Sequence, residues 1–165
     1  MKKITTLFLL LISGMAFAQP TNNAPTPPSR NPGDVISLYS DTYTNIGNIN
    51  YNPFWGQSGS VNTAYNPGTG NLVMAYTNFN YQGTDYAANP QNASAMEYLH
   101  IDIWTSNATV VKVSPIDNSG TGAGETLVSI PLVNGGWSSI DLPKAAFTGM
   151  TWNSIFQLKF DGQAG

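Results

Sequence analysis

The sequence contains no cysteine, and only 9% of its residues are charged. The absence of cysteine excludes disulfide bonds and leaves packing, or a bound metal, as the source of stability. The scarcity of charge leaves Asn, Gln, Ser, Thr and Tyr to form the polar surface, together with 16 glycines. A neutral polar surface that also carries aromatic rings suits hydroxyl-rich ligands, because these offer hydrogen bonds and apolar ring faces in place of charge.

The chain also lacks the side-chain groupings on which common enzyme sites depend. Its two glutamates, Glu97 and Glu125, fall in separate predicted strands, without the clustering typical of the paired carboxylates of a glycoside hydrolase. Its single histidine, His100, lies two residues from Asp102, but no Gly-x-Ser-x-Gly motif accompanies them. One histidine without cysteine does not make a zinc site, and no phosphate-binding glycine loop is present. We therefore predict no catalytic residues and a protein that is not an enzyme.

No apolar run is long enough to span a membrane as a helix. The longest covers residues 4–15, follows two lysines and precedes Ala16-Phe17-Ala18. This run of about a dozen residues falls short of the ~20 that a spanning helix needs, and the small-x-small triplet is typical of a signal-peptidase site. We therefore predict a signal peptide over residues 1–18 in place of a membrane anchor, and export to the periplasm, the medium or the cell surface.

Basic residues are scarce once the predicted signal peptide is removed. Four basic residues then stand against nine acidic ones, a formal net charge of −5, and no basic cluster remains. This balance argues against nucleic acid and anionic membranes as partners.

The roughly 147 remaining residues match the size of one domain. Residues 19–33 hold five prolines and almost no apolar side chains, so we predict an extended proline-rich linker ahead of one domain over residues 34–165.

Helical periodicity is nearly absent, and short alternating apolar segments instead lie between clusters of Gly, Pro, Asn and Asp. This pattern predicts an all-β fold, a two-sheet antiparallel β-sandwich. Residues 78–95 are expected to form a long loop, of a kind that is often functional, and Leu142–Phe147 a helical turn. The expected strands are Asp34–Ser40, Val61–Tyr65, Asn71–Thr77, Met96–Thr105, Thr109–Ser114, Glu125–Leu132, Trp137–Asp141 and Ser154–Phe160.

Alternation within two of these strands separates a core face from a second face. In residues 98–104, one leucine and two isoleucines share one side, while aromatic and polar side chains share the other. In residues 155–160, the apolar side chains alternate with Gln157 and Lys159. This phase predicts that one outer face of the sandwich is polar or aromatic and available for a ligand.

Aromatic residues are the strongest functional signal. Four Trp and eight Tyr are many for so polar a chain. Flat rings stack on the apolar faces of pyranoses, while amides and carboxylates form hydrogen bonds with sugar hydroxyls. For each aromatic residue the alternative is packing, since large aromatic side chains dominate cores. The candidate carbohydrate-binding residues are Trp55, Tyr81, Gln82, Tyr86 and Trp104.

Two features concern the ends of the predicted strands. Asp41 follows the first and Asp161 the last, so the two carboxylates share a Ca²⁺ if these strands are neighbours. Solvated surface carboxylates are the alternative.

The final strand is followed by the turn residues Asp161-Gly162, which predicts a missing partner strand and a longer protein beyond Gly165. A frayed natural terminus is the alternative.

Five segments along the chain share a recognisable pattern, namely Val35–Asn45, Asn52–Gln57, Asn78–Gly83, Met96–Trp104 and Gln157–Gly162. In this order they resemble a module of secreted Bacteroidetes proteins that often accompanies laminarinase-type glycoside hydrolases. The resemblance covers residues 34–162 and implies a galactose-binding-like jelly-roll carbohydrate-binding module, with a structural Ca²⁺ at Asp41 and Asp161. The chain departs from the module at its end, where the module continues into one more strand of Tyr-Leu-Asp-Asn type.

The residues and the resemblance together predict a non-catalytic carbohydrate-binding module that targets a secreted or surface protein to a neutral, β-glucan-like polysaccharide. Its expected partners are the polysaccharide and further domains of the same chain, without nucleic acid and without membrane insertion. Two alternatives stay open. The module is a structural or adhesion spacer with no sugar site, or it is the N-terminal accessory part of a glycoside hydrolase whose catalytic domain lies beyond residue 165.

Overall fold

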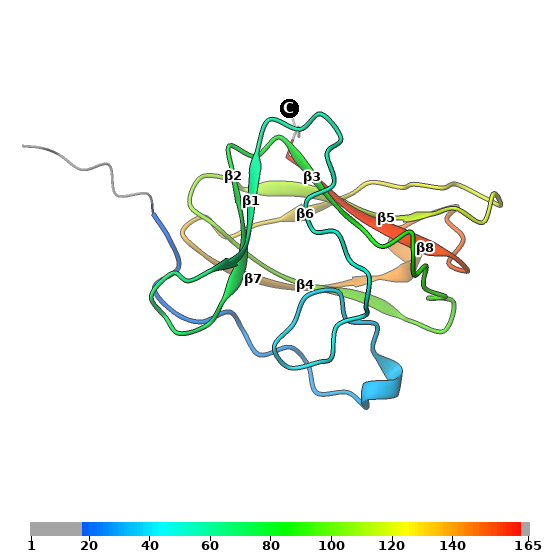
Figure 1. The fold of residues 1–165 in the computed structure, drawn as a ribbon, viewed down its shortest axis with the longest axis horizontal. Coiled ribbons are helices and arrows are strands. Elements are labelled where there is room, and N and C mark those ends of the chain that lie inside the picture. The colour runs from blue at the N-terminus through cyan, green and yellow to red at the C-terminus, as the bar shows by residue number, and fades with distance from the viewer. Residues whose placement is uncertain (1–17, 163–165) are drawn as a thin grey trace, which may run out of the picture.

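The computed structural model describes residues 18–162, which form antiparallel β-strands and two short 3₁₀ helices (Figure 1). The predicted signal peptide, apart from its last residue, lies outside these residues, as does the segment after Gly162. The strands are β1 (Ser60–Tyr65), β2 (Val73–Thr77), β3 (Tyr81–Asp85), β4 (Tyr98–Thr105), β5 (Val110–Asp117), β6 (Val128–Pro131), β7 (Gly136–Pro143) and β8 (Ile155–Asp161), and the helices are η1 (Pro32–Asp34) and η2 (Lys144–Ala146).

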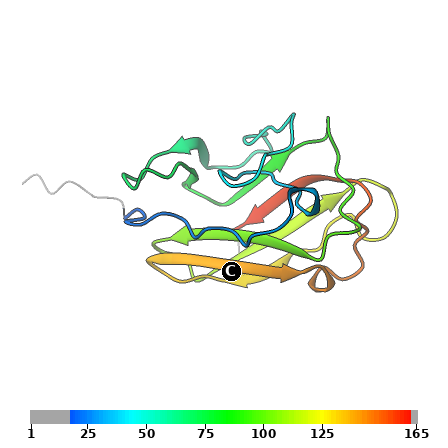
Figure 2. The same cartoon turned by 90° about the horizontal axis from the view of Figure 1, so that it is seen from below.

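The strands form three antiparallel sheets, so the predicted all-β architecture is confirmed. The largest sheet has the order β3-β8-β5-β6, while β4 pairs with β7 and β1 pairs with β2. β4 and β7 pack against one face of the large sheet (Figure 2), and Tyr76 of β2 contacts Phe160 on that same face, with ring centroids 6.2 Å apart. The result is a β-sandwich-like fold in which β8 lies inside the large sheet, hydrogen-bonded to β3 and β5.

The core lies between the large sheet and the β4–β7 pair. Val113 and Ile130 of the large sheet are fully buried, and Leu158 and Leu142 approach them from β8 and β7. Leu99, Ile101, Ile103 and Ile140 complete the cluster as partly buried side chains. Full burial of one such side chain contributes about 1.5–3 kcal/mol relative to exposure. The predicted phase of residues 98–104 and of Leu158 and Phe160 is therefore confirmed.

Two segments differ from the sequence predictions. Residues 34–40 were expected to form a strand, but they contain only a single bridge, Ser37 to Asn45, beyond the end of η1. Ser37 Oγ lies 2.7 Å from Asn45 Oδ1, a local side-chain bond of the kind that competes with sheet pairing. Residues 78–95, predicted to form a loop, contain β3, in which Gly83 and Asp85 have low intrinsic β-propensity.

The proline-rich segment lies against the domain. Trp137 Nε1 donates to Asn22 O at 3.2 Å, and Tyr43 OH donates to Pro28 O at 2.6 Å. Ala24 N donates to Asn71 Oδ1 at 3.3 Å. Aromatic and amide side chains of the domain thus hold the segment through two of its carbonyls and one of its N–H groups, without adding it to a sheet.

Asp117 joins the turn after β5 to the turn before β8. Its carboxylate is 5% exposed and accepts hydrogen bonds from the backbone N–H of Ser119 at 2.7 Å and of Ser154 at 2.9 Å, as well as from Ser119 Oγ. Burial by itself raises the pKa of Asp117, but these hydrogen bonds to the charged form outweigh it and hold the pKa below its usual value.

We expect Asp117→Asn to lower the free energy of unfolding by about 2 kcal/mol at pH 7, because it weakens bonds to a buried charge. The pKa of Asp117 is lower in the folded chain than the unfolded value of about 3.9. Its contribution is therefore present above about pH 4 and is lost as the pH falls through the lowered pKa. Urea unfolding at pH 7 and pH 3 measures the free energy of unfolding of wild type and variant. The control is Asp34→Asn, because Asp34 is exposed. Equal acid sensitivity of wild type and Asp117→Asn would contradict the prediction.

Candidate functional site

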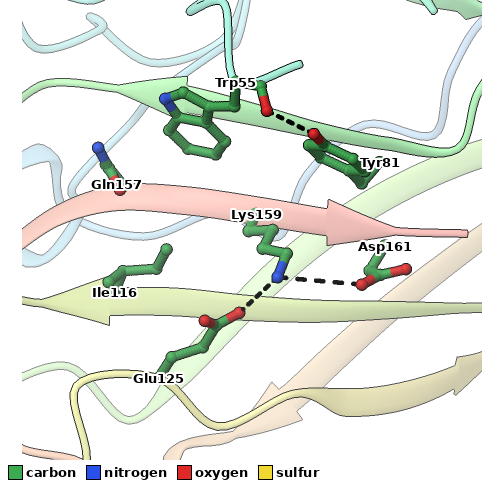
Figure 3. Close-up of a pocket in the computed structure, with 7 residues that line it drawn as sticks. All are labelled: Trp55, Tyr81, Ile116, Glu125, Gln157, Lys159 and Asp161. Carbon is green, nitrogen blue, oxygen red and sulfur yellow. Dashed lines mark hydrogen bonds and ion pairs between the residues drawn. The ribbon is translucent and has the colours of Figure 1, made fainter. Parts of the chain in front are cut away.

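A hollow of about 440 Å³ lies on the face of the large sheet opposite the core (Figure 3). It is shallow and open to solvent. Its lining comes from a loop before β1, from β3, β5 and β8, and from the segment that leads into β6. The lining residues are Trp55, Tyr81, Ile116, Glu125, Gln157, Lys159 and Asp161.

Strand register brings the lining residues together. On β8, Gln157, Lys159 and Asp161 point to one face because side chains alternate along a strand. Their partners on β3 are Asp85, Gly83 and Tyr81, respectively. On the other side of β8, Ile116 of β5 lies opposite Gln157. The floor of the hollow therefore spans three adjacent strands, with β8 at its centre.

The indole ring of Trp55 lies directly against Gly83. A Cβ atom at Gly83 would lie 1.8 Å from Trp55 Cζ3 and 2.0 Å from Cη2, so no side chain fits there. Gly83 is thus required for close approach, and the ring takes the place of the missing side chain on β3. The position of Trp55 over the strand is set by this contact.

The loop that carries Trp55 is braced by side chains. Gln57 Oε1 accepts from Trp55 N at 2.7 Å, and Gln57 Nε2 donates to Pro53 O at 2.7 Å. Tyr81 OH donates to Trp55 O, which ties the loop to β3 (Figure 3). Gly56 supplies the left-handed backbone that this turn needs, with φ of 82°. The ring is therefore held in place before any ligand arrives.

The side of the hollow opposite Trp55 is charged. Lys159 Nζ lies 3.0 Å from Glu125 Oε1 and 3.9 Å from Asp161 Oδ2. The three side chains are 23%, 37% and 20% exposed, respectively. Gln157 Nε2 donates to Asp85 Oδ2 at 2.6 Å, which fixes the amide at the edge of the hollow. The hollow thus combines an aromatic surface with hydrogen-bond donors and acceptors held by ion pairs.

The structure brings some of the predicted binding residues together and separates the others. Trp55 and Tyr81 both line the hollow. Gln82 and Tyr86 are 2% and 3% exposed and lie in the interior. Gln82 follows Tyr81 on β3 and therefore points to the opposite face. Burial raises the pKa of the Tyr86 phenol, as expected for a packed side chain.

Trp104 lies on the outer face of the β4–β7 pair, away from the hollow. It is the cross-strand partner of Trp137, and His100 is the partner of Asp141. His100 Nδ1 lies 2.7 Å from Asp141 Oδ1, and Nε2 lies 3.3 Å from Asp102 Oδ2. Both ring nitrogens thus face carboxylates, and the three side chains connect β4 to β7.

The two predicted calcium ligands line separate hollows. Asp161 lies in the hollow described above, and Asp41 lines a second one of about 270 Å³ beside the proline-rich segment. Asp41 Oδ2 accepts from Asn71 Nδ2 at 2.8 Å. Among residues 18–162, no group of three or more His, Asp or Glu side chains is placed to hold a metal. A Ca²⁺ shared by the two carboxylates stays a prediction.

Three polar residues of the hollow were not among the predicted site residues. The alternation of residues 155–160 already placed Gln157 and Lys159 on one face, so this signal was present in the sequence. Glu125 lies in an irregular segment between β5 and β6, joined to Ile116 by a single bridge. No local pattern indicates that such a residue reaches β8.

Comparison with protein-family models, curated proteins and solved structures finds no match for this chain. Within residues 18–162, no helix has the length and apolar character that a membrane crossing requires. The chemistry of the hollow is therefore derived from its geometry.

We expect Gly83→Ala to displace the Trp55 ring, because the new Cβ would overlap it. Overpacking of this kind costs about 1–3 kcal/mol. The control is Gly47→Ala, where nothing lies within 4 Å of the new atom. Urea unfolding measures the free energy of unfolding of both glycine variants, alone and in a Trp55→Ala background. The Gly83 substitution should cost little once Trp55 is absent, and an equal cost in both backgrounds would show that the ring does not depend on Gly83.

Proposed function

We propose that residues 34–162 act as a non-catalytic carbohydrate-binding module that holds a neutral, β-glucan-like polysaccharide in the hollow of the large sheet. The observation that carries this proposal is the Trp55 ring, which is seated on Gly83 beside a row of polar side chains. An indole face stacks on the apolar face of a pyranose, and Tyr81 extends the aromatic side of the hollow. Amide and charged groups at the opposite side then bind the hydroxyls.

The braced loop favours binding by a site that is already formed. Gln57 and Tyr81 hold the backbone on both sides of the Trp55 ring, so little conformational freedom is lost when a ligand docks. The hollow is open to solvent, so a long chain can enter it from the side. We expect weak binding per site, because an open hollow covers only part of the sugar surface.

The wider context of the module is part of the same proposal. We infer a jelly-roll, galactose-binding-like arrangement for the sandwich, a signal peptide that exports the chain, and residence in the periplasm, the medium or at the cell surface. The module would keep an attached domain, such as a glycoside hydrolase, close to its polysaccharide. A structural Ca²⁺ shared by Asp41 and Asp161 belongs to this proposal as well.

We expect Trp55→Ala to abolish retardation of the chain in affinity electrophoresis through laminarin, xylan, β-1,4-mannan, agarose or starch. Loss of the stacked ring should weaken binding at least about tenfold, the equivalent of about 1.4 kcal/mol. Tyr98→Ala is the matched control, since Tyr98 is 56% exposed and lies on β4, away from the hollow.

Circular dichroism first establishes that each variant is folded. Retardation in one glycan that survives Tyr98→Ala and disappears in folded Trp55→Ala supports the proposal. Retardation that survives Trp55→Ala would move the binding site away from this hollow. No retardation of the wild type in any of the five gels would favour a structural spacer.

A further inference from the structure

On the charged side of the hollow, a hydrogen-bond donor and an acceptor lie side by side. Lys159 Nζ and Glu125 Oε1 are 3.0 Å apart, and their side chains remain 23% and 37% exposed. An ammonium group has three N–H donors and a carboxylate has about four acceptor positions, so their mutual bond leaves both able to bind a ligand. Such a pair is complementary to two neighbouring hydroxyls, one accepting from Nζ and the other donating to the carboxylate.

The ion pair lies next to the aromatic surface. Lys159 is the cross-strand partner of Gly83, the residue on which the Trp55 ring rests. Directly opposite residues in an antiparallel pair have Cα atoms about 4.5–5.5 Å apart. Figure 3 shows Lys159 and Glu125 across β8 from Trp55. A pyranose stacked on Trp55 would therefore present part of its hydroxyl-bearing rim to this ion pair.

The charges in the hollow restrict the ligand further. Its lining holds two carboxylates, those of Glu125 and Asp161, and one ammonium, that of Lys159. A sulfate or uronate placed beside these two carboxylates is disfavoured, because like charges repel in a partly desolvated site. Uncharged sugars meet no such penalty.

We propose that Lys159 and Glu125 select a vicinal diol on an uncharged pyranose, an inference that rests on the proposed function of the hollow. The internal units of 1,4-linked chains such as xylan, β-1,4-mannan and starch carry free hydroxyls on carbons 2 and 3. The internal units of 1,3-linked laminarin and of agarose carry no pair of neighbouring free hydroxyls. The module therefore binds a 1,4-linked chain in preference to a 1,3-linked one.

Affinity electrophoresis of the full chain tests this inference with glycans in which the diol is present or destroyed. The probes are xylan, β-1,4-mannan and starch, each used intact and after periodate cleavage of its diols followed by borohydride reduction, together with laminarin and agarose. We expect retardation in at least one intact 1,4-linked glycan and loss of that retardation after periodate treatment. Periodate breaks the bond between carbons 2 and 3 and opens the ring as well, so two variants separate diol recognition from ring stacking. Lys159→Met and Glu125→Gln should each weaken binding about tenfold, the range for hydrogen bonds to charged groups.

Lys112→Met is the matched control. Lys112 is on β5, where it is the cross-strand partner of Asp161 on β8. It is on the same face of the sheet but does not line the hollow, so its loss should leave binding unchanged. Circular dichroism monitors the folding of each variant. If Lys159→Met does not fold, Glu125→Gln tests the inference alone, because the Glu125 side chain is the more exposed of the two.

The outcomes separate the two proposals. Retardation in any of these glycans that is undiminished in Lys159→Met and Glu125→Gln would overturn the diol inference and leave carbohydrate binding in place. Absence of retardation in every gel would overturn both. Retardation that depends on an intact diol and on Lys159 and Glu125, but not on Lys112, would establish the inference.

Discussion

The architecture depends on the placement of β8 inside the large sheet, with hydrogen bonds to β3 on one side and β5 on the other. A strand in this position must serve both faces of its sheet, because its side chains alternate. Leu158 points into the core against the β4–β7 pair, while its neighbour Lys159 points into the hollow. The packing that stabilises the sandwich therefore also fixes the spacing of the polar groups on the opposite face.

The hollow is completed by a contact between segments far apart in the sequence. The loop before β1 places Trp55 over Gly83 of β3, and Tyr81 ties that loop to the same strand. The free edge of β3 is covered nearby, because the backbone of Asn50 exchanges hydrogen bonds of 2.7 and 2.8 Å with Asp85. Unpaired edge groups are otherwise open to unwanted pairing. The segment before β1 thus contacts β3 at both its face and its edge.

The outer face of the β4–β7 pair is organised differently. At its polar centre, His100 contacts the carboxylates of Asp102 and Asp141. A neutral imidazole has one N–H and can donate to only one of the two, whereas an imidazolium donates to both. Trp137, beside Trp104, donates to the backbone of the proline-rich segment. Aromatic side chains on this face therefore hold another part of the chain, whereas Trp55 rests on Gly83 and borders an open hollow.

The sequence by itself determined the fold class and the two-sided character of its strands, because alternation at every second residue is a local property that register does not alter. It also singled out Trp55 and Tyr81, the two aromatic residues that the fold brings to one hollow. Only the tertiary structure decided that Gln82 is buried, that a glycine lies beneath Trp55 and that Glu125 meets Lys159. These outcomes depend on which strands pair and in which register, and on the path of irregular segments over the sheet, so they arise from long-range contacts that no local pattern specifies.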